Sequence, residues 1–167
     1  MTKLHVEYDH SEYGGDALSD DKWCDHEDVV VYFKPTNVHL NRANANSWRN
    51  EDIDSDEEVK SGDTVYLVVV RYSDGDTFGH STGNYSFWGA YKNVERAKNL
   101  KELIKKDAEL IKNRHASKKE MIRIQNKSEK LCNQIMELAT NPYASKYNWH
   151  GYFNDLEDVE IHVMTAI

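Results

Sequence analysis

The segment from Asp74 to Tyr85 carries the side chains of this sequence that are best suited to bind a ligand. It reads Asp-Gly-Asp-Thr-Phe-Gly-His-Ser-Thr-Gly-Asn-Tyr, which supplies carboxylates, hydroxyls, an imidazole, an amide and three glycines. Glycine lets the backbone approach a ligand closely, and successive backbone N–H groups form anion-binding concavities. We therefore interpret the segment as a site for a nucleotide or another phosphate-bearing small molecule. The alternative is that it only reverses the chain, because Gly, Asp, Asn and Ser are common turn residues.

Aromatic side chains elsewhere would complete such a site. Trp88 and Tyr91 offer faces for stacking, and the stretch 149–153 (Trp-His-Gly-Tyr-Phe) offers a second wall. For 149–153 we favour another interpretation, an aromatic plug that packs the end of a helix on a sheet. The predicted ligand-binding residues are Arg71, Asp74, Asp76, Thr77, His80, Ser81, Thr82, Asn84, Trp88 and Trp149.

Catalysis has weaker support than binding. The sequence has no nucleophile elbow, zinc-protease, P-loop or dinucleotide-binding motif. His80 and Ser81 are adjacent, so on an extended chain their side chains point to opposite faces and do not pair as base and nucleophile. We expect a binding protein without catalytic residues or a cofactor. The rival is an enzyme acting on a nucleotide, with Asp74, Asp76 and His80 as acid–base groups.

Two acidic clusters match metal sites only in part. Residues 52–56 (Asp-Ile-Asp-Ser-Asp) have the first spacings of a calcium loop, but Glu57 replaces its glycine and Asp63 its bidentate glutamate. Cys24 precedes an Asp-His-Glu-Asp run, and no second cluster follows at a zinc-like spacing. The sequence therefore predicts no metal site.

The length and composition of the chain predict one folded domain over residues 1–167. Net charge is −8, but residues 1–63 hold 16 acidic and 6 basic side chains, whereas residues 92–139 hold 13 basic and 7 acidic ones. The two regions either steer partners or attract each other. Two distant cysteines, no apparent leader peptide and no apolar run of about 20 residues predict a reduced, intracellular protein.

The alternation of apolar residues predicts an α+β fold. The apolar, β-branched run 65–70 predicts a central strand buried on both faces. Further strands are expected at 4–8, 29–33 and 85–91, with a half-buried closing strand at 159–164, which gives an antiparallel sheet of about five strands. The acidic residues 50–62 are expected to be exposed, and 37–48 is either a short strand or a loop.

A helical insertion is expected at 94–139, before the last strand. Asn93 is a suitable N-cap, and an apolar face runs from Val94 to Ile111. A second seam has a heptad spacing and consists of Met121, Ile124, Ser128, Leu131, Ile135 and Leu138. The segment is either a helical hairpin, which we favour, or one long helix that requires a partner subunit and hence a homo-oligomer.

Three motifs resemble those of small uncharacterised bacteriophage accessory proteins. They are the strand and turn at 68–79, which contains a YSxGDTFG pattern, the helix start at 93–97, and the WxGYF element at 149–153 before the last strand. The resemblance covers residues 64–167 and carries over no catalytic residues. It implies a phage origin and action in the host bacterial cytoplasm, where small accessory proteins often counter host defence.

Together these observations predict a non-enzymatic counter-defence protein that binds and sequesters a phosphate-bearing ligand, such as a host immune signalling nucleotide. The alternative is an acidic protein that inhibits a host defence or nucleic-acid-processing enzyme by covering its basic surface. The acids that would do so are Glu51, Asp52, Asp54, Asp56, Glu57 and Glu58. No membrane partner is expected.

Overall fold

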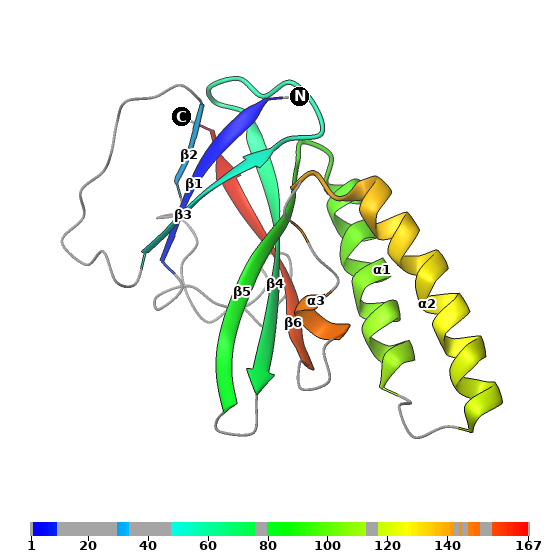
Figure 1. Cartoon of the computed structure of the whole chain (residues 1–167). Helices are drawn as coiled ribbons and strands as arrows, with labels where there is room; N and C mark the ends of the chain where they lie inside the picture. Colours follow the sequence, from blue (N-terminus) through cyan, green and yellow to red (C-terminus); the bar gives the residue numbers. More distant parts are fainter. Residues whose placement is uncertain are drawn as a thin grey trace.

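The fold is α+β, with two small antiparallel sheets and a helical hairpin before the last strand (Figure 1). The computed structural model describes residues 2–9, 30–33, 48–75, 80–112, 117–141, 144, 147–150 and 155–166. The strands are β1 (Lys3–Asp9), β2 (Val30–Phe33), β3 (Trp48–Asp54), β4 (Thr64–Gly75), β5 (His80–Tyr91) and β6 (Asp155–Thr165). The helices are α1 (Val94–Ile111), α2 (Lys118–Leu138) and α3 (Tyr147–His150).

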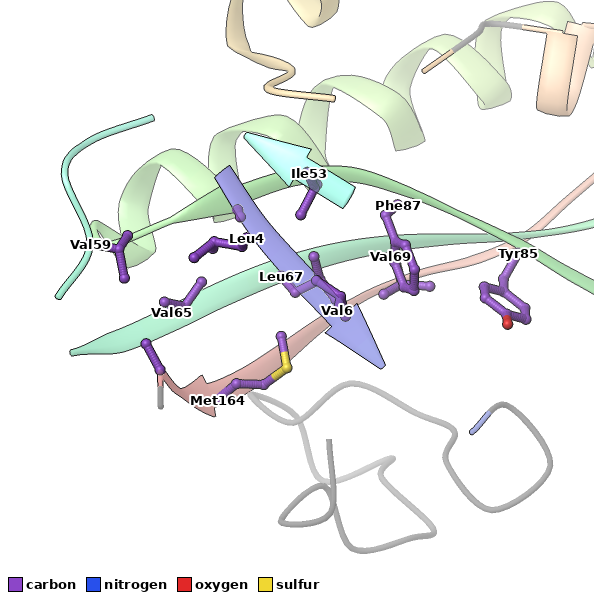
Figure 2. Packing of buried hydrophobic residues seen from close by; sticks show 12 residues of the cluster. Leu4, Val6, Ile53, Val59, Val65, Leu67, Val69, Tyr85, Phe87 and Met164 are labelled. Atoms are coloured by element: carbon purple, nitrogen blue, oxygen red, sulfur yellow. The ribbon is translucent and has the colours of Figure 1, made fainter. Parts of the chain in front are cut away.

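The expected single sheet of about five strands is divided into two sheets of three. One has the strand order β2-β1-β3 and the other β5-β4-β6. The first packs on one face of the second, where side chains of β1 and β3 meet those of β4, β5 and β6 (Figure 2). This layering explains why β4 is buried on both faces, as predicted.

Strand β4 separates two hydrophobic clusters. Val65, Leu67 and Val69 pack between the sheets, whereas Val68 and Val70 face the helices. All five side chains are fully buried. Alternate residues of a strand point to opposite faces, so a continuous apolar run is what a strand with two covered faces requires.

A β-bulge in β5 changes which face its side chains reach. Val68 pairs with Gly89 and Val69 with Phe87, so Trp88 is the extra residue. Phe87 points into the cluster between the sheets and Trp88 into the cluster under the helices, as the alternation of a strand requires. Because of the extra residue, Trp88 and Gly89 both lie opposite Val68, and Ala90 then returns to the cluster between the sheets.

Strand β3 corrects part of the expectation that residues 50–62 form an exposed acidic segment, since Glu57, Glu58 and residues 60–62 are exposed as predicted but 50–54 belong to a paired strand. Its backbone pairs with β1 from Lys3↔Asp54 to Asp9↔Trp48, and Ile53 is buried between the sheets. Val59 is buried as well. Pairing with a neighbouring strand has outweighed the low β propensity of the acidic residues.

The two predicted helices are present and pack side by side as a hairpin (Figure 1). Asn93 caps α1 as expected, since its side chain accepts a hydrogen bond of 2.9 Å from the Glu95 N–H. Neither helix is long and apolar enough to cross a membrane.

The predicted seam of α2 is only partly correct. Ser128 and Ile135 are buried, but Met121 is 48% exposed. A straight helix turns by about 20° per heptad relative to a 3.5-residue repeat, so one end of a long seam rotates away from its partner.

Candidate functional site

The β4–β5 hairpin extends past its neighbour β6 at the end where ligand binding was predicted (Figure 1). The last pair between β4 and β6 is Ser73↔Asp155, whereas β4 and β5 continue to pair through Asp74↔Ser81 and Gly75↔His80. Thr82 follows on β5. Asp76 and Thr77 lie outside the described residues, so their predicted roles stay predictions.

Arg71 does not reach the hairpin end as a free cation, because it forms a buried ion pair with Glu160 of β6. Its Nε contacts both carboxylate oxygens, at 3.0 Å for Oε2. His162 Nε2 lies 3.5 Å from the same carboxylate. Glu160 and His162 were expected on the exposed face of a half-buried strand, but both are fully buried. Asn84, further from the hairpin end, is half-buried opposite Tyr72.

Trp88 and Trp149 contact each other in the core under the helical hairpin. Their ring centroids are 5.0 Å apart, and both side chains are buried. Trp88 stands eight residues after His80, or roughly 26 Å along an extended strand. The structure thus separates the two tryptophans from the hairpin end and supports the plug interpretation for Trp149.

A group of polar residues that was not predicted meets around the Asp107 carboxylate. Asp107 of α1 is fully buried and contacts Ser128 and Cys132 of α2 and Trp149 and His150 of α3. We call these five residues the Asp107 cluster. Oδ1 accepts from Ser128 Oγ at 2.6 Å, and Oδ2 lies 2.9 Å from Trp149 Nε1, 2.5 Å from His150 Nε2 and 3.6 Å from Cys132 Sγ.

These contacts keep the carboxylate ionised despite its burial. Burial raises the pKa of Asp107, but hydrogen bonds from His150, Ser128 and Trp149 outweigh it and leave that pKa below its ordinary value. A buried, charged carboxylate is tolerated only where several donors satisfy it. The cluster meets this condition with donors from two helices.

The cluster is not arranged as a Cys–His–Asp relay. In such a relay one ring nitrogen of histidine faces the nucleophile and the other faces the carboxylate. Here a single atom, His150 Nε2, lies 2.5 Å from Asp107 Oδ2 and 3.9 Å from Cys132 Sγ. The geometry suits shared coordination or hydrogen bonding better than proton transfer to a nucleophile.

Sequence signals for this cluster existed. Asp107 lies next to Ala108 and three residues after Ile104 on the apolar face of α1, where a charged residue needs a buried partner. Ser128 and Cys132 are four residues apart, so they share a face of α2. No local sequence pattern indicates that His150 belongs to the Asp107 cluster, because its position depends on the path of the chain after α2.

The acidic and basic regions contact each other where the structure describes them. Asp56 Oδ2 lies 3.1 Å from Arg96 Nη1, and Asp63 Oδ2 lies 2.9 Å from Lys92 Nζ. Part of the acidic surface is therefore neutralised within the chain. The two regions therefore attract each other at Asp56 and Asp63, whereas Glu57 and Glu58 are exposed, and the inhibitor alternative stays a prediction.

Comparisons with known proteins assign no family to this chain. No family model matches it, and no curated protein or solved structure matches it either. The resemblance to phage accessory proteins thus remains a hypothesis that rests on three short motifs. Function has to be argued from the residues of this chain.

Proposed function

We propose that this chain is a non-enzymatic phage accessory protein that binds and sequesters a nucleotide-like ligand at the end of the β4–β5 hairpin. The supporting observation is that β4 and β5 keep pairing beyond the last residue of β6 that pairs with β4. Among the described residues, β6 does not pair with β4 beyond Ser73, so no described strand lies beside this part of β4 on that side. We place the ligand at this end of the hairpin.

The residue types at this end match a ligand with both phosphate and sugar groups. Ser81 and Thr82 supply hydroxyl donors, and Gly75 has no side chain that would keep a ligand from its backbone. The Asp74 carboxylate disfavours a bare phosphate but accepts hydrogen bonds from ribose hydroxyls, a role that acidic residues have in dinucleotide sites. A nucleotide combines both groups, which is why we prefer it to inorganic phosphate.

The remaining chemistry of the described residues supports binding over catalysis. The Asp107 cluster is buried and is not arranged as a relay, and the Arg71 charge is matched by Glu160. Trp88 and Trp149 stabilise the core. We therefore restrict the proposed site to the hairpin end and leave Arg71, Trp88 and Trp149 out of it.

Isothermal titration against cyclic nucleotides, ADP-ribose-type nucleotides, ribose and inorganic phosphate tests this proposal. Binding of at least one nucleotide is expected, with Thr82→Ala weakening it roughly tenfold or more, since a hydrogen bond to a charged group contributes about 1.5–3 kcal/mol. Thr64→Ala is the matched control, because it removes an exposed hydroxyl at the other end of the same hairpin.

Recovery of the ligand separates sequestration from turnover. Sequestration predicts that the nucleotide is released unchanged when the complex is denatured after long incubation. Accumulation of a product of the nucleotide over time would instead support the rival hypothesis, in which the protein is an enzyme that acts on the nucleotide. Absence of heat with every nucleotide, on protein shown to be folded by circular dichroism, would reject the proposal.

A further inference from the structure

We propose that Asp107, Cys132 and His150 form a binding site for one divalent transition-metal ion, of which Zn²⁺ fits best. One ligand atom from each residue lies within 4.8 Å of the other two. The three residues come from α1, α2 and α3, so an ion between them would connect the helical hairpin to the segment before β6. This inference is independent of the proposed ligand site at the hairpin end.

The distances are close to those of a tetrahedral site. Zinc bonds of about 2.0–2.3 Å place neighbouring ligand atoms about 3.4–3.6 Å apart. Cys132 Sγ lies 3.6 Å from Asp107 Oδ2 and 3.9 Å from His150 Nε2, which requires little movement. Asp107 Oδ2 and His150 Nε2 are hydrogen-bonded at 2.5 Å, and an ion would take the place of the proton between them and move them apart by about 0.9 Å. Metal binding would leave the neutral imidazole with its proton on Nδ1 and release the Cys132 thiol proton to solvent.

Ser128 and Trp149 support the carboxylate as outer-shell residues of a metal site do. Ser128 Oγ donates to Oδ1 at 2.6 Å and Trp149 Nε1 donates to Oδ2 at 2.9 Å. Both bonds fix the orientation of the carboxylate without using the sulfur or the imidazole. Hydrogen-bonded ligating carboxylates are a regular feature of metal centres.

The surroundings provide space for a fourth ligand and a route for the ion. A cavity of about 50 Å³ borders the cysteine and is lined by Trp88, Cys132, Ile135, Met136 and Trp149. Its volume is sufficient for one water molecule, and because its lining is mostly apolar the metal ion would be the polar partner that holds this water as the fourth ligand. The His150 side chain is 16% exposed, so an ion can enter at the imidazole.

The donor atoms select the kind of metal. Calcium and magnesium prefer sets made of oxygen, whereas sulfur and imidazole nitrogen favour later transition metals. One carboxylate, one thiolate and one imidazole form a mixed set suited to Zn²⁺ and to its spectroscopic substitute Co²⁺. The competing explanation is that the cluster is only a hydrogen-bonded network that stabilises the apo protein.

Cobalt absorption distinguishes the two explanations. The full chain with Cys24→Ser is the starting protein, because Cys132 is then its only thiol. After treatment with a chelator, one equivalent of Co²⁺ should produce a thiolate-to-cobalt charge-transfer band that Zn²⁺ removes at one equivalent. Cys132→Ser in the same background should abolish the band. A folded Cys24→Ser chain without the band and without stoichiometric Zn²⁺ binding would overturn the proposal.

Two further measurements do not depend on removing a ligand. Ser128→Ala should keep the band but weaken Co²⁺ affinity roughly tenfold, as outer-shell changes do, whereas Ser61→Ala in an exposed turn should leave it unchanged. Zn²⁺ should also slow modification of Cys132 by a thiol reagent at least tenfold in the Cys24→Ser chain. An unchanged modification rate would contradict a metal–thiolate bond even if Cys132→Ser failed to fold.

Discussion

The indole rings of Trp88 and Trp149 lie 5.0 Å apart, centroid to centroid, at an interplanar angle of 45°. Trp88 reaches this position from the face of β5 that lies under the helices, and Trp149 reaches it from the short helix α3. The contact connects the sheet with α3, which contributes Trp149 and His150 to the Asp107 cluster. Both tryptophans thus have structural roles rather than the ligand-stacking role considered from the sequence.

Replacing Trp149 with phenylalanine should destabilise the protein by about 2–3 kcal/mol. The change removes part of a buried ring and the donor that bonds Asp107 Oδ2 at 2.9 Å. Urea denaturation monitored by circular dichroism measures the loss. A free energy of unfolding within about 0.5 kcal/mol of the wild-type value would be typical of a surface residue and would contradict the described packing.

Gly89 should not tolerate alanine, because a Cβ at that position would overlap the ring of Tyr91. The ring is fully buried and cannot move without disturbing the cluster under the helices. Overpacking of this kind costs about 1–3 kcal/mol. Thermal unfolding of Gly89→Ala measures the cost, and Gly62→Ala does not serve as a control because Gly62 has a φ of 91°. Thr64→Ala at an exposed position of the paired strand β4 is a better comparison, with a smaller expected effect, and equal melting temperatures for wild type and Gly89→Ala would reject the prediction.

Tyr91 should make the protein sensitive to alkaline pH. Burial raises the pKa of its phenol, which donates a hydrogen bond to the Leu138 carbonyl oxygen. The folded state thus keeps this proton at a pH where the unfolded chain, with an ordinary pKa of about 10, has released it. The stabilisation is complete below that value and is lost as pH rises through and beyond it, by about 1.4 kcal/mol per pH unit.

Comparison with Tyr91→Phe isolates this effect from other titrating groups. At pH 7 the variant should be less stable by about 1 kcal/mol, because it lacks the hydrogen bond. Above pH 10 the wild type should lose stability faster than the variant, so the difference should shrink and then reverse. Parallel stability curves from pH 7 to 11, from urea denaturation, would show that the phenol is not buried as described.

The Arg71–Glu160 pair should behave as a buried ion pair and not as a ligand contact. Arg71→Met leaves the Glu160 carboxylate buried without its cation, which should cost about 3–5 kcal/mol. The double variant Arg71→Met/Glu160→Gln removes the uncompensated charge and should recover most of the loss. A double-mutant cycle by chemical denaturation measures the coupling, and strictly additive single effects would argue against a direct pair.

Local patterns in the sequence were sufficient to predict most of the fold. The apolar run of β4 needed two covered faces, and the side chain of Asn93 is a typical helix cap. Strand β3 was missed because its pairing with β1 depends on a distant segment and not on the propensity of its own residues. The division into two sheets likewise depends on long-range packing.

The candidate sites show a similar division between local and long-range information. The polar segment 74–85 was recognisable from composition and a hairpin is confirmed there, but its second strand begins at His80 and not at Tyr85 as predicted. The Asp107 cluster combines three helices, and only the fold brings His150 next to Cys132. A buried aspartate within an apolar helix face was the one sequence signal that would have suggested it.

The small molecule that co-purifies with the protein tests the central claim most directly. The chain and its Thr82→Ala variant are purified in parallel from the bacterial cells that express them. Both proteins are then denatured, and the released compounds are identified by mass spectrometry. We expect an intact phosphate-bearing nucleotide from the wild type at close to one equivalent, and a strongly reduced amount from the variant. Release of no such compound, or of equal amounts from both proteins, would contradict binding at the end of the β4–β5 hairpin.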